Sequence, residues 1–90
     1  MSKEVDFKNR DRFIQLGITI AAIRKMQGFS QETLAEKAGI SRSHLSAIEA
    51  PNMVHPFSLE VLFDIADALN VEPNDLLKAS VFPDNLMKKK

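Results

Sequence analysis

The strongest constraint on the fold is a pair of short helical segments joined across four residues, Ala38 to Ser41. Gly39 allows the positive φ that a tight turn needs, and Ser41 is a good N-cap for the segment that follows. A connection this short is too tight for an antiparallel hairpin and sets the two helices at a steep angle. The apolar residues on the facing sides of the two segments are Leu34, Ala35, Leu45 and Ile48.

Two longer stretches have apolar residues at intervals of three and four, the spacing that lines one face of a helix. The first stretch predicts a helix that ends just before Gly28, and the second predicts a helix from Ser58 to about Asn70. Pro73 fits the first turn of a short last helix that runs through Leu77. No alternation of apolar and polar residues is long enough to indicate a strand, so the predicted fold class is all-α with five helices. The residues expected inside the two longer helices are Phe13, Leu16, Ile20, Ile23, Leu59, Leu62, Phe63, Ala66 and Leu69.

The chain of 90 residues is long enough for one domain. We expect residues 1–12 to form an N-terminal arm, 13–79 the folded domain and 80–90 a C-terminal tail. Twelve basic and 12 acidic side chains give a net charge of zero, which argues against a general polyanion binder. Residues 1–28 are rich in Lys and Arg whereas 51–80 are rich in Asp and Glu. That polarity can orient a domain on nucleic acid, but it is also common on ordinary surfaces.

Several function classes find no support in the residue types present. The chain has no cysteine, which excludes disulfides and thiolate metal sites. It also lacks a Gly-rich phosphate loop, a nucleophile with its base and a cluster of metal ligands, so we expect neither an enzyme nor a cofactor. The apolar run from Phe13 to Ile23 is shorter than the roughly 20 residues of a membrane span. These features predict a cytoplasmic binding protein with no role at the membrane.

The order of these signals resembles one family of regulators, the Cro and phage-repressor type, also called the XRE family. The resemblance implies a five-helix, lambda-repressor-like domain with a helix-turn-helix. It also implies a sequence-specific transcriptional regulator of double-stranded DNA, a repressor or autoregulator that works on the nucleoid. Pro51 departs from the family, which usually has Gly there, so the loop that follows can take its own path. The resemblance covers Leu16 to Leu77 and is carried by Leu16-Gly17, Ile20 to Arg24, Phe29 to Ala35, Gly39 to Ser41, Leu45-Ser46, Ile48-Glu49, Pro56, Leu59, Leu69 to Val71 and Asp75 to Leu77.

The helix from Arg42 to about Ala50 is expected to enter the major groove. The guanidinium of Arg42 can bond both acceptors of a guanine, although a solvated Arg at a helix start is the plainer alternative. His44 has too few partners for a metal site and is expected either at the groove or simply exposed. The resemblance implies that Gln31 meets a phosphate at the start of the second helix. The full set of residues expected at the DNA is Gln31, Ser41, Arg42, Ser43, His44, Ser46, Ala47 and Asn52.

Arg24 and Glu49 are expected to have a structural role instead. The resemblance implies that they form a partly buried ion pair, which ties the first helix to the end of the third. Removing one partner would leave an unpaired charge, and that is costly even where the pair itself adds little stability.

We expect a homodimer on a two-fold symmetric operator, because one domain this small buries too little DNA surface for tight specific binding. Val81, Phe82, Leu86 and Met87 are too apolar for a solvated tail. We therefore expect the fifth helix and the segment from Ser80 to Met87 to hold the dimer, the alternative being that these tail residues fold back on their own domain. Two other functions stay open: a protein-interaction module of the same fold that has lost DNA binding, and a regulator controlled by a partner protein such as a toxin.

Overall fold

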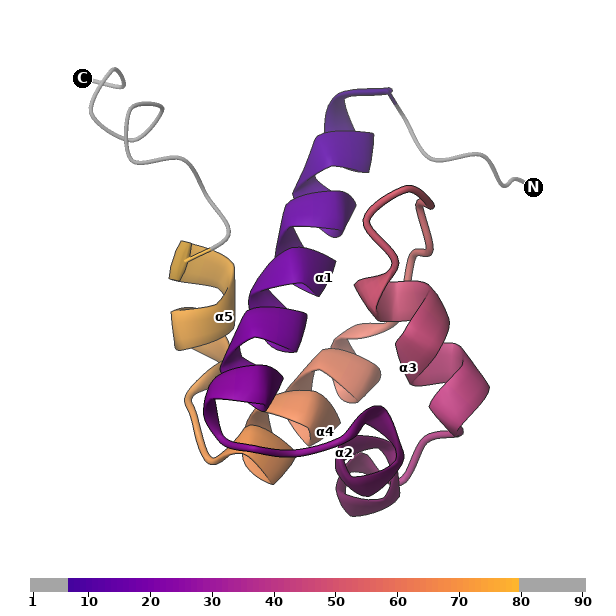
Figure 1. The fold of residues 1–90 in the computed structure, drawn as a ribbon. Helices are drawn as coiled ribbons and strands as arrows, with labels where there is room; N and C mark the ends of the chain where they lie inside the picture. Colours follow the sequence, from indigo (N-terminus) through magenta and orange to yellow (C-terminus); the bar gives the residue numbers. More distant parts are fainter. Residues whose placement is uncertain (1–6, 80–90) are drawn as a thin grey trace.

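The computed structural model describes residues 7–79, and over this range the chain forms five α-helices and no strand (Figure 1). The all-helical fold class expected from the sequence is therefore confirmed. α3 lies on one side of the molecule and α5 on the other, with α1 and α4 between them. The helices are α1 (Phe7–Met26), α2 (Gln31–Ala38), α3 (Arg42–Glu49), α4 (Leu59–Leu69) and α5 (Pro73–Ala79).

Three serines begin the three central helices, as the sequence predicts. The hydroxyl oxygens of Ser30, Ser41 and Ser58 each accept a hydrogen bond from the backbone amide three residues further on, at 3.0, 3.0 and 3.1 Å. Such a cap contributes about 1 kcal/mol to the stability of the helix. Gly39 (φ 75°) and Asn70 (φ 59°) end α2 and α4 in the left-handed conformation, which tightly terminates each helix.

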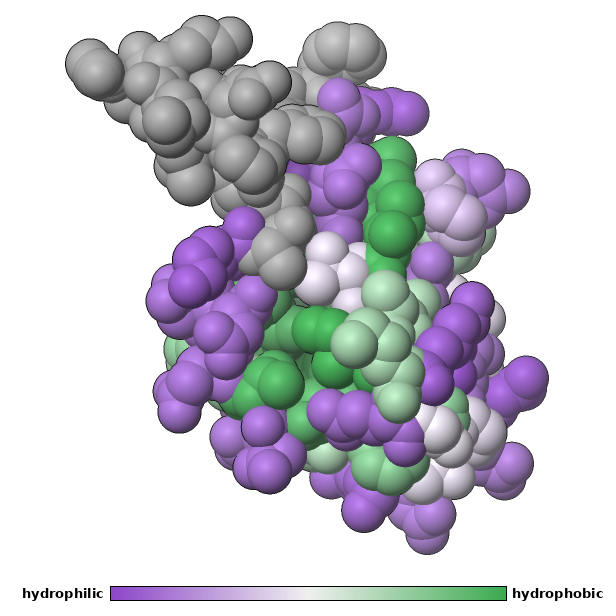
Figure 2. All heavy atoms as spheres, turned by 60° about the vertical axis from the view of Figure 1, so that its left-hand side comes forward, coloured by the Kyte–Doolittle hydropathy of each residue, from purple (hydrophilic) through white to green (hydrophobic). Residues whose placement is uncertain are grey.

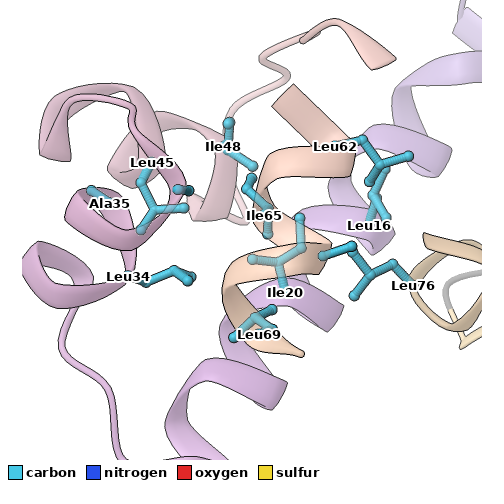
Figure 3. Close-up of a cluster of buried hydrophobic side chains, with 12 residues drawn as sticks. Leu16, Ile20, Leu34, Ala35, Leu45, Ile48, Leu62, Ile65, Leu69 and Leu76 are labelled. Carbon is cyan, nitrogen blue, oxygen red and sulfur yellow. The ribbon is translucent and has the colours of Figure 1, made fainter. Parts of the chain in front are cut away.

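One apolar core joins all five helices. In Figure 3, Ile65 of α4 lies in the middle of this core, with residues of α2 and α3 on one side and residues of α1 and α5 on the other. Six side chains of the core are completely or almost completely buried: Ile20, Leu34, Leu45, Ile65, Leu69 and Leu76. Every helix supplies at least one of them, and in α3 the buried Ile48 joins Leu45, so each helix is held by its apolar side.

Leu62, Ala66 and Leu69 of α4 are buried as predicted, but the rest of the buried side differs from the prediction. Leu59 and Phe63 were expected in the core, but 66% and 46% of their surfaces are exposed, whereas Ile65 is completely buried. α4 has apolar residues around more than one side, and its sequence spacing alone does not tell which side meets the core. With about 3.6 residues per turn, Leu59 and Phe63 lie together on one flank, beyond Leu62 and away from Ile65.

α1 begins at Phe7 and not near Phe13, so residues 7–12, which were expected in an arm, are helical. This segment has no apolar repeat that could reveal a helix, but its Lys and Arg residues are good helix formers. Arg12 Nη1 also donates to Asn9 Oδ1 at 3.1 Å across one turn. Although α1 is 20 residues long, no described helix combines the length and apolar character needed to cross a membrane.

Candidate nucleic-acid interface

The turn between α2 and α3 holds the two helices at a fixed angle. Gly39 takes a φ of 75°, and the backbone N–H of Ile40 donates to the carbonyl oxygen of Ala35 at 3.0 Å. The side chain of Ile40 is half-buried and packs against the core. α2 in turn packs on α4, so the position of α3 is set by the core of the domain (Figure 1).

α3 lies at the edge of the molecule (Figure 1), and its exposed residues are polar. Arg42, Ser43 and Ser46 are exposed, and His44 and Ala47 are half-buried. Leu45 and Ile48 of α3 are buried in the core. Only Arg42 has a long side chain among the exposed residues, so a flat or convex partner could approach the backbone of α3 closely.

Two further residues of the predicted interface flank α3. Ser41 is exposed, and its hydroxyl is already bonded to the amide of His44, so its described role is to cap the helix. At the other end α3 stops at Glu49, and Asn52 is exposed in the loop that follows. The backbone N–H of Met53 donates to the carbonyl oxygen of Ala50 at 3.4 Å, which turns the chain directly after the helix.

A buried ion pair connects α1 to the end of α3. Arg24 Nε donates to Glu49 Oε2 at 2.9 Å and Arg24 Nη2 donates to Glu49 Oε1 at 3.0 Å. The third guanidinium nitrogen donates to the carbonyl oxygen of Phe29 at 2.7 Å. Arg24 is only 8% exposed and Glu49 only 6%. The two-pronged geometry fixes both the distance and the orientation between the helices.

Gln31 belongs to the same network. Its side-chain Nε2 donates to Glu49 Oε1 at 2.9 Å, so the carboxylate accepts three hydrogen bonds in all. Sequence reasoning assigned Gln31 to a phosphate and did not foresee this bond. A contact with phosphate would use the second hydrogen of the side-chain amide or the backbone N–H at the start of α2, and it stays a prediction.

Gly17 lets α1 and α3 approach closely next to the ion pair. A Cβ atom at this position would collide with the carbonyl oxygen of Ile48. The backbone of α1 therefore rests almost directly on the last turn of α3. Together with the ion pair, this contact positions the C-terminal end of the exposed helix.

His55 also lies at this surface, although the sequence did not predict it there. Its ring meets the ring of His44 edge to face, with centroids 5.2 Å apart and an interplanar angle of 74°. The loop after α3 therefore folds back against the solvent side of that helix. No periodicity marks such a contact in the sequence. Over the described part of the chain, no group of three or more His, Cys, Asp or Glu residues could hold a metal ion.

Comparison with known sequences agrees with this geometry. The helix-turn-helix family profile matches residues 20–76, more than half of the chain. The HTH-type transcriptional regulator SinR of Bacillus subtilis (strain 168) is 39% identical over 62 residues, which cover 69% of this chain and 55% of SinR. The chain thus spans about half the length of that relative.

Solved structures give the same picture. The restriction-modification controller protein C.AhdI from Aeromonas hydrophila superposes with a TM-score of 0.67 at 33% identity, covering 71% of this chain and 94% of that one. The structure of SinR in complex with DNA, described as the master regulator for biofilm formation, has a TM-score of 0.62 at 39% identity and covers 69% of this chain and 97% of that one.

Proposed function

The chain belongs to the helix-turn-helix family of the Cro and phage-repressor type, and on this premise we propose that it is a sequence-specific, double-stranded DNA-binding transcriptional regulator. The observation that carries the proposal is the solvent side of α3. It combines one exposed Arg with small polar side chains, on a helix that is capped and fixed to the core at both ends. The related protein SinR has been solved in complex with DNA, which supports the proposal. Its place of action is the nucleoid in the cytoplasm.

In this proposal α3 lies in the major groove and Arg42 reads a base. The planar guanidinium bonds O6 and N7 of a guanine, the commonest specific contact between side chain and base. Ser43 and Ser46 are short enough to bond base edges or phosphates, and Ala47 can touch a thymine methyl group. His44 stands beside them, held against the ring of His55.

The ends of the two helices position the domain on the DNA backbone. The backbone amides at the start of α2, beside Gln31, suit a phosphate oxygen because the N-terminal end of a helix carries unpaired donors and partial positive charge. Ser41 and Asn52 stand at the start of α3 and after its end. Contacts of this kind fix the register of the protein on the duplex and leave the choice of sequence to α3.

The regulator acts as a homodimer in this proposal. Leu59, Phe63 and Leu77 have 66%, 46% and 43% of their surfaces exposed. Leu62 of α4 points toward Leu16 of α1 and Leu76 of α5 (Figure 3), and α4 packs on α5. Figure 2 brings the α5 side of the molecule forward and shows apolar side chains gathered there between polar ones.

An exposed apolar area of this kind marks an interface, and a two-fold dimer covers it on both copies at once. Two copies would then bring two α3 helices to a two-fold symmetric operator. The tail residues Val81, Phe82, Leu86 and Met87 lie outside the described residues, so their place at this interface is part of the proposal. Truncation after Ala79 tests it: loss of the dimer with retained helicity supports the tail's role, and a truncated chain that stays dimeric contradicts it.

The function is tested by comparing Arg42→Ala with Lys25→Ala, which removes an exposed positive charge at the far end of α1. Arg42→Ala should weaken binding to a specific duplex by about 1–3 kcal/mol and relax the preference at one base position. Lys25→Ala should leave the preference unchanged. If the two variants select the same sequences as the parent with the same affinity, Arg42 does not read DNA.

A further inference from the structure

We propose that Arg10, on the first turns of α1, binds a phosphate of the DNA backbone beside the segment that α3 reads. The inference rests on the proposed DNA-binding function and adds a contact from a part of the chain that precedes the family match. That match begins at residue 20, whereas α1 begins at Phe7. The early turns of α1 are thus additional to the matched region, and Arg10 is exposed on them.

The register of α1 places Arg10 on the side that faces α3. Arg10, Gly17 and Arg24 are spaced by seven residues, close to two helical turns, so they share one face of α1. Arg24 pairs with Glu49, and Gly17 rests on the carbonyl of Ile48. This face of α1 therefore runs along the C-terminal end of α3, and Arg10 extends it by two further turns, about 10 Å.

Beyond the end of α3, this face of α1 meets the loop that leads to α4. Phe13 touches Phe57 with ring centroids 5.8 Å apart at an interplanar angle of 70°. Figure 1 shows the same arrangement, with the N-terminal half of α1 beside the loop between α3 and α4. That loop begins directly after the helix proposed to enter the groove and carries the exposed Asn52. Arg10 thus stands at the flank of the proposed DNA surface.

Electrostatics favour a phosphate as the ligand. The guanidinium is always charged and presents a planar fork that matches phosphate geometry. The chain has as many acidic as basic side chains, so its affinity for DNA depends on where individual charges stand rather than on their sum. Arg12 serves as the control for Arg10. The two residues are two positions apart, which is about 200° around the helix, so their side chains leave nearly opposite sides of α1. Arg12 is also exposed, and it donates to Asn9 within α1.

The experiment compares Arg10→Ala, Arg10→Lys and Arg12→Ala, each at several salt concentrations on a duplex that the parent binds. Arg10→Ala should weaken binding about fivefold, the upper range for an exposed ion pair. It should also lower the slope of log K against log salt by about 0.9 for each bound chain. Arg10→Lys should keep most of that slope, and Arg12→Ala should behave like the parent. Sequence preference should not change in any of the three.

Shortening the duplex at its ends gives an independent readout, since removal of the flanking phosphates should abolish the difference between Arg10→Ala and the parent. The proposal is overturned if Arg10→Ala matches the parent in affinity and salt slope, or if Arg12→Ala loses as much as Arg10→Ala. If the parent itself binds no duplex, the proposed function fails and this inference fails with it. If Arg10 binds an acidic protein instead of DNA, Arg10→Ala will match the parent in affinity and salt slope, which overturns the proposal.

Discussion

Replacing Arg24 by Ala should destabilise the domain strongly, because the change strands the carboxylate of Glu49 in the interior. Glu49 is 6% exposed and would keep only the hydrogen bond from Gln31, having lost both from Arg24. Breaking a buried ion pair on one side typically costs about 3–5 kcal/mol. In a domain of this size, a loss of about 3 kcal/mol lowers Tm by on the order of 10–25 °C.

The assay is thermal unfolding followed by circular dichroism, with Arg12→Ala as the control for loss of an exposed Arg. Glu49→Ala should destabilise in the same way, since it leaves the guanidinium of Arg24 buried with only the Phe29 carbonyl as a partner. The double variant Arg24→Met with Glu49→Leu should recover much of the loss, because replacing both charges of a buried pair by apolar residues is often neutral. Unchanged Tm values in both single variants would refute the reasoning.

Three other substitutions test the packing and assembly described above. Gly17→Ala should lower Tm without altering base preference, because the added Cβ forces α1 away from Ile48; an unchanged Tm would show that the two helices separate at no cost. His55→Ala should cost about 0.5–1.5 kcal/mol through loss of the ring contact with His44, measured by denaturant unfolding, and no loss would mean that the rings contribute nothing. Phe63→Glu should turn the dimer into a monomer, as measured by sedimentation. Met26→Glu, at a residue with 82% of its surface exposed, should leave the dimer intact. Equal behaviour of the two variants would place the interface elsewhere.

Much of the fold is predictable from local chemistry. The three serine caps, Gly39 and the steep turn are each determined by a few neighbouring residues, so sequence alone located α2, α3 and the start of α4. Sequence alone does not decide which side of a helix is buried when several orientations of the helix would bury a similar apolar area. α4 has apolar residues on more than one side, and only packing against α5 and the rest of the core decides that Ile65 is buried and Phe63 is exposed.

The candidate site, too, is only partly predictable from the sequence. The outward residues of α3 follow from helical periodicity once the buried residues Leu45 and Ile48 are known. The bond from Gln31 to Glu49 and the ring contact between His44 and His55 join residues that are distant in sequence or lie in a loop without periodicity. The bond depends on how α2 and α3 are set relative to each other, and the ring contact depends on the path of the backbone after Pro51. No local pattern specifies either of them.

Selection of duplexes from a random-sequence library tests the central claim most directly. The account predicts an enriched two-fold symmetric site whose half-sites lie about one DNA turn apart, roughly 34 Å. It also predicts binding of that site with Kd on the order of 10⁻⁸ M or tighter at physiological salt. The same selection with Arg42→Ala should lose its preference at one position in each half-site. If no sequence is enriched, the claim that α3 reads DNA is contradicted. The same holds if substitutions in α3 do not alter which sequence is enriched.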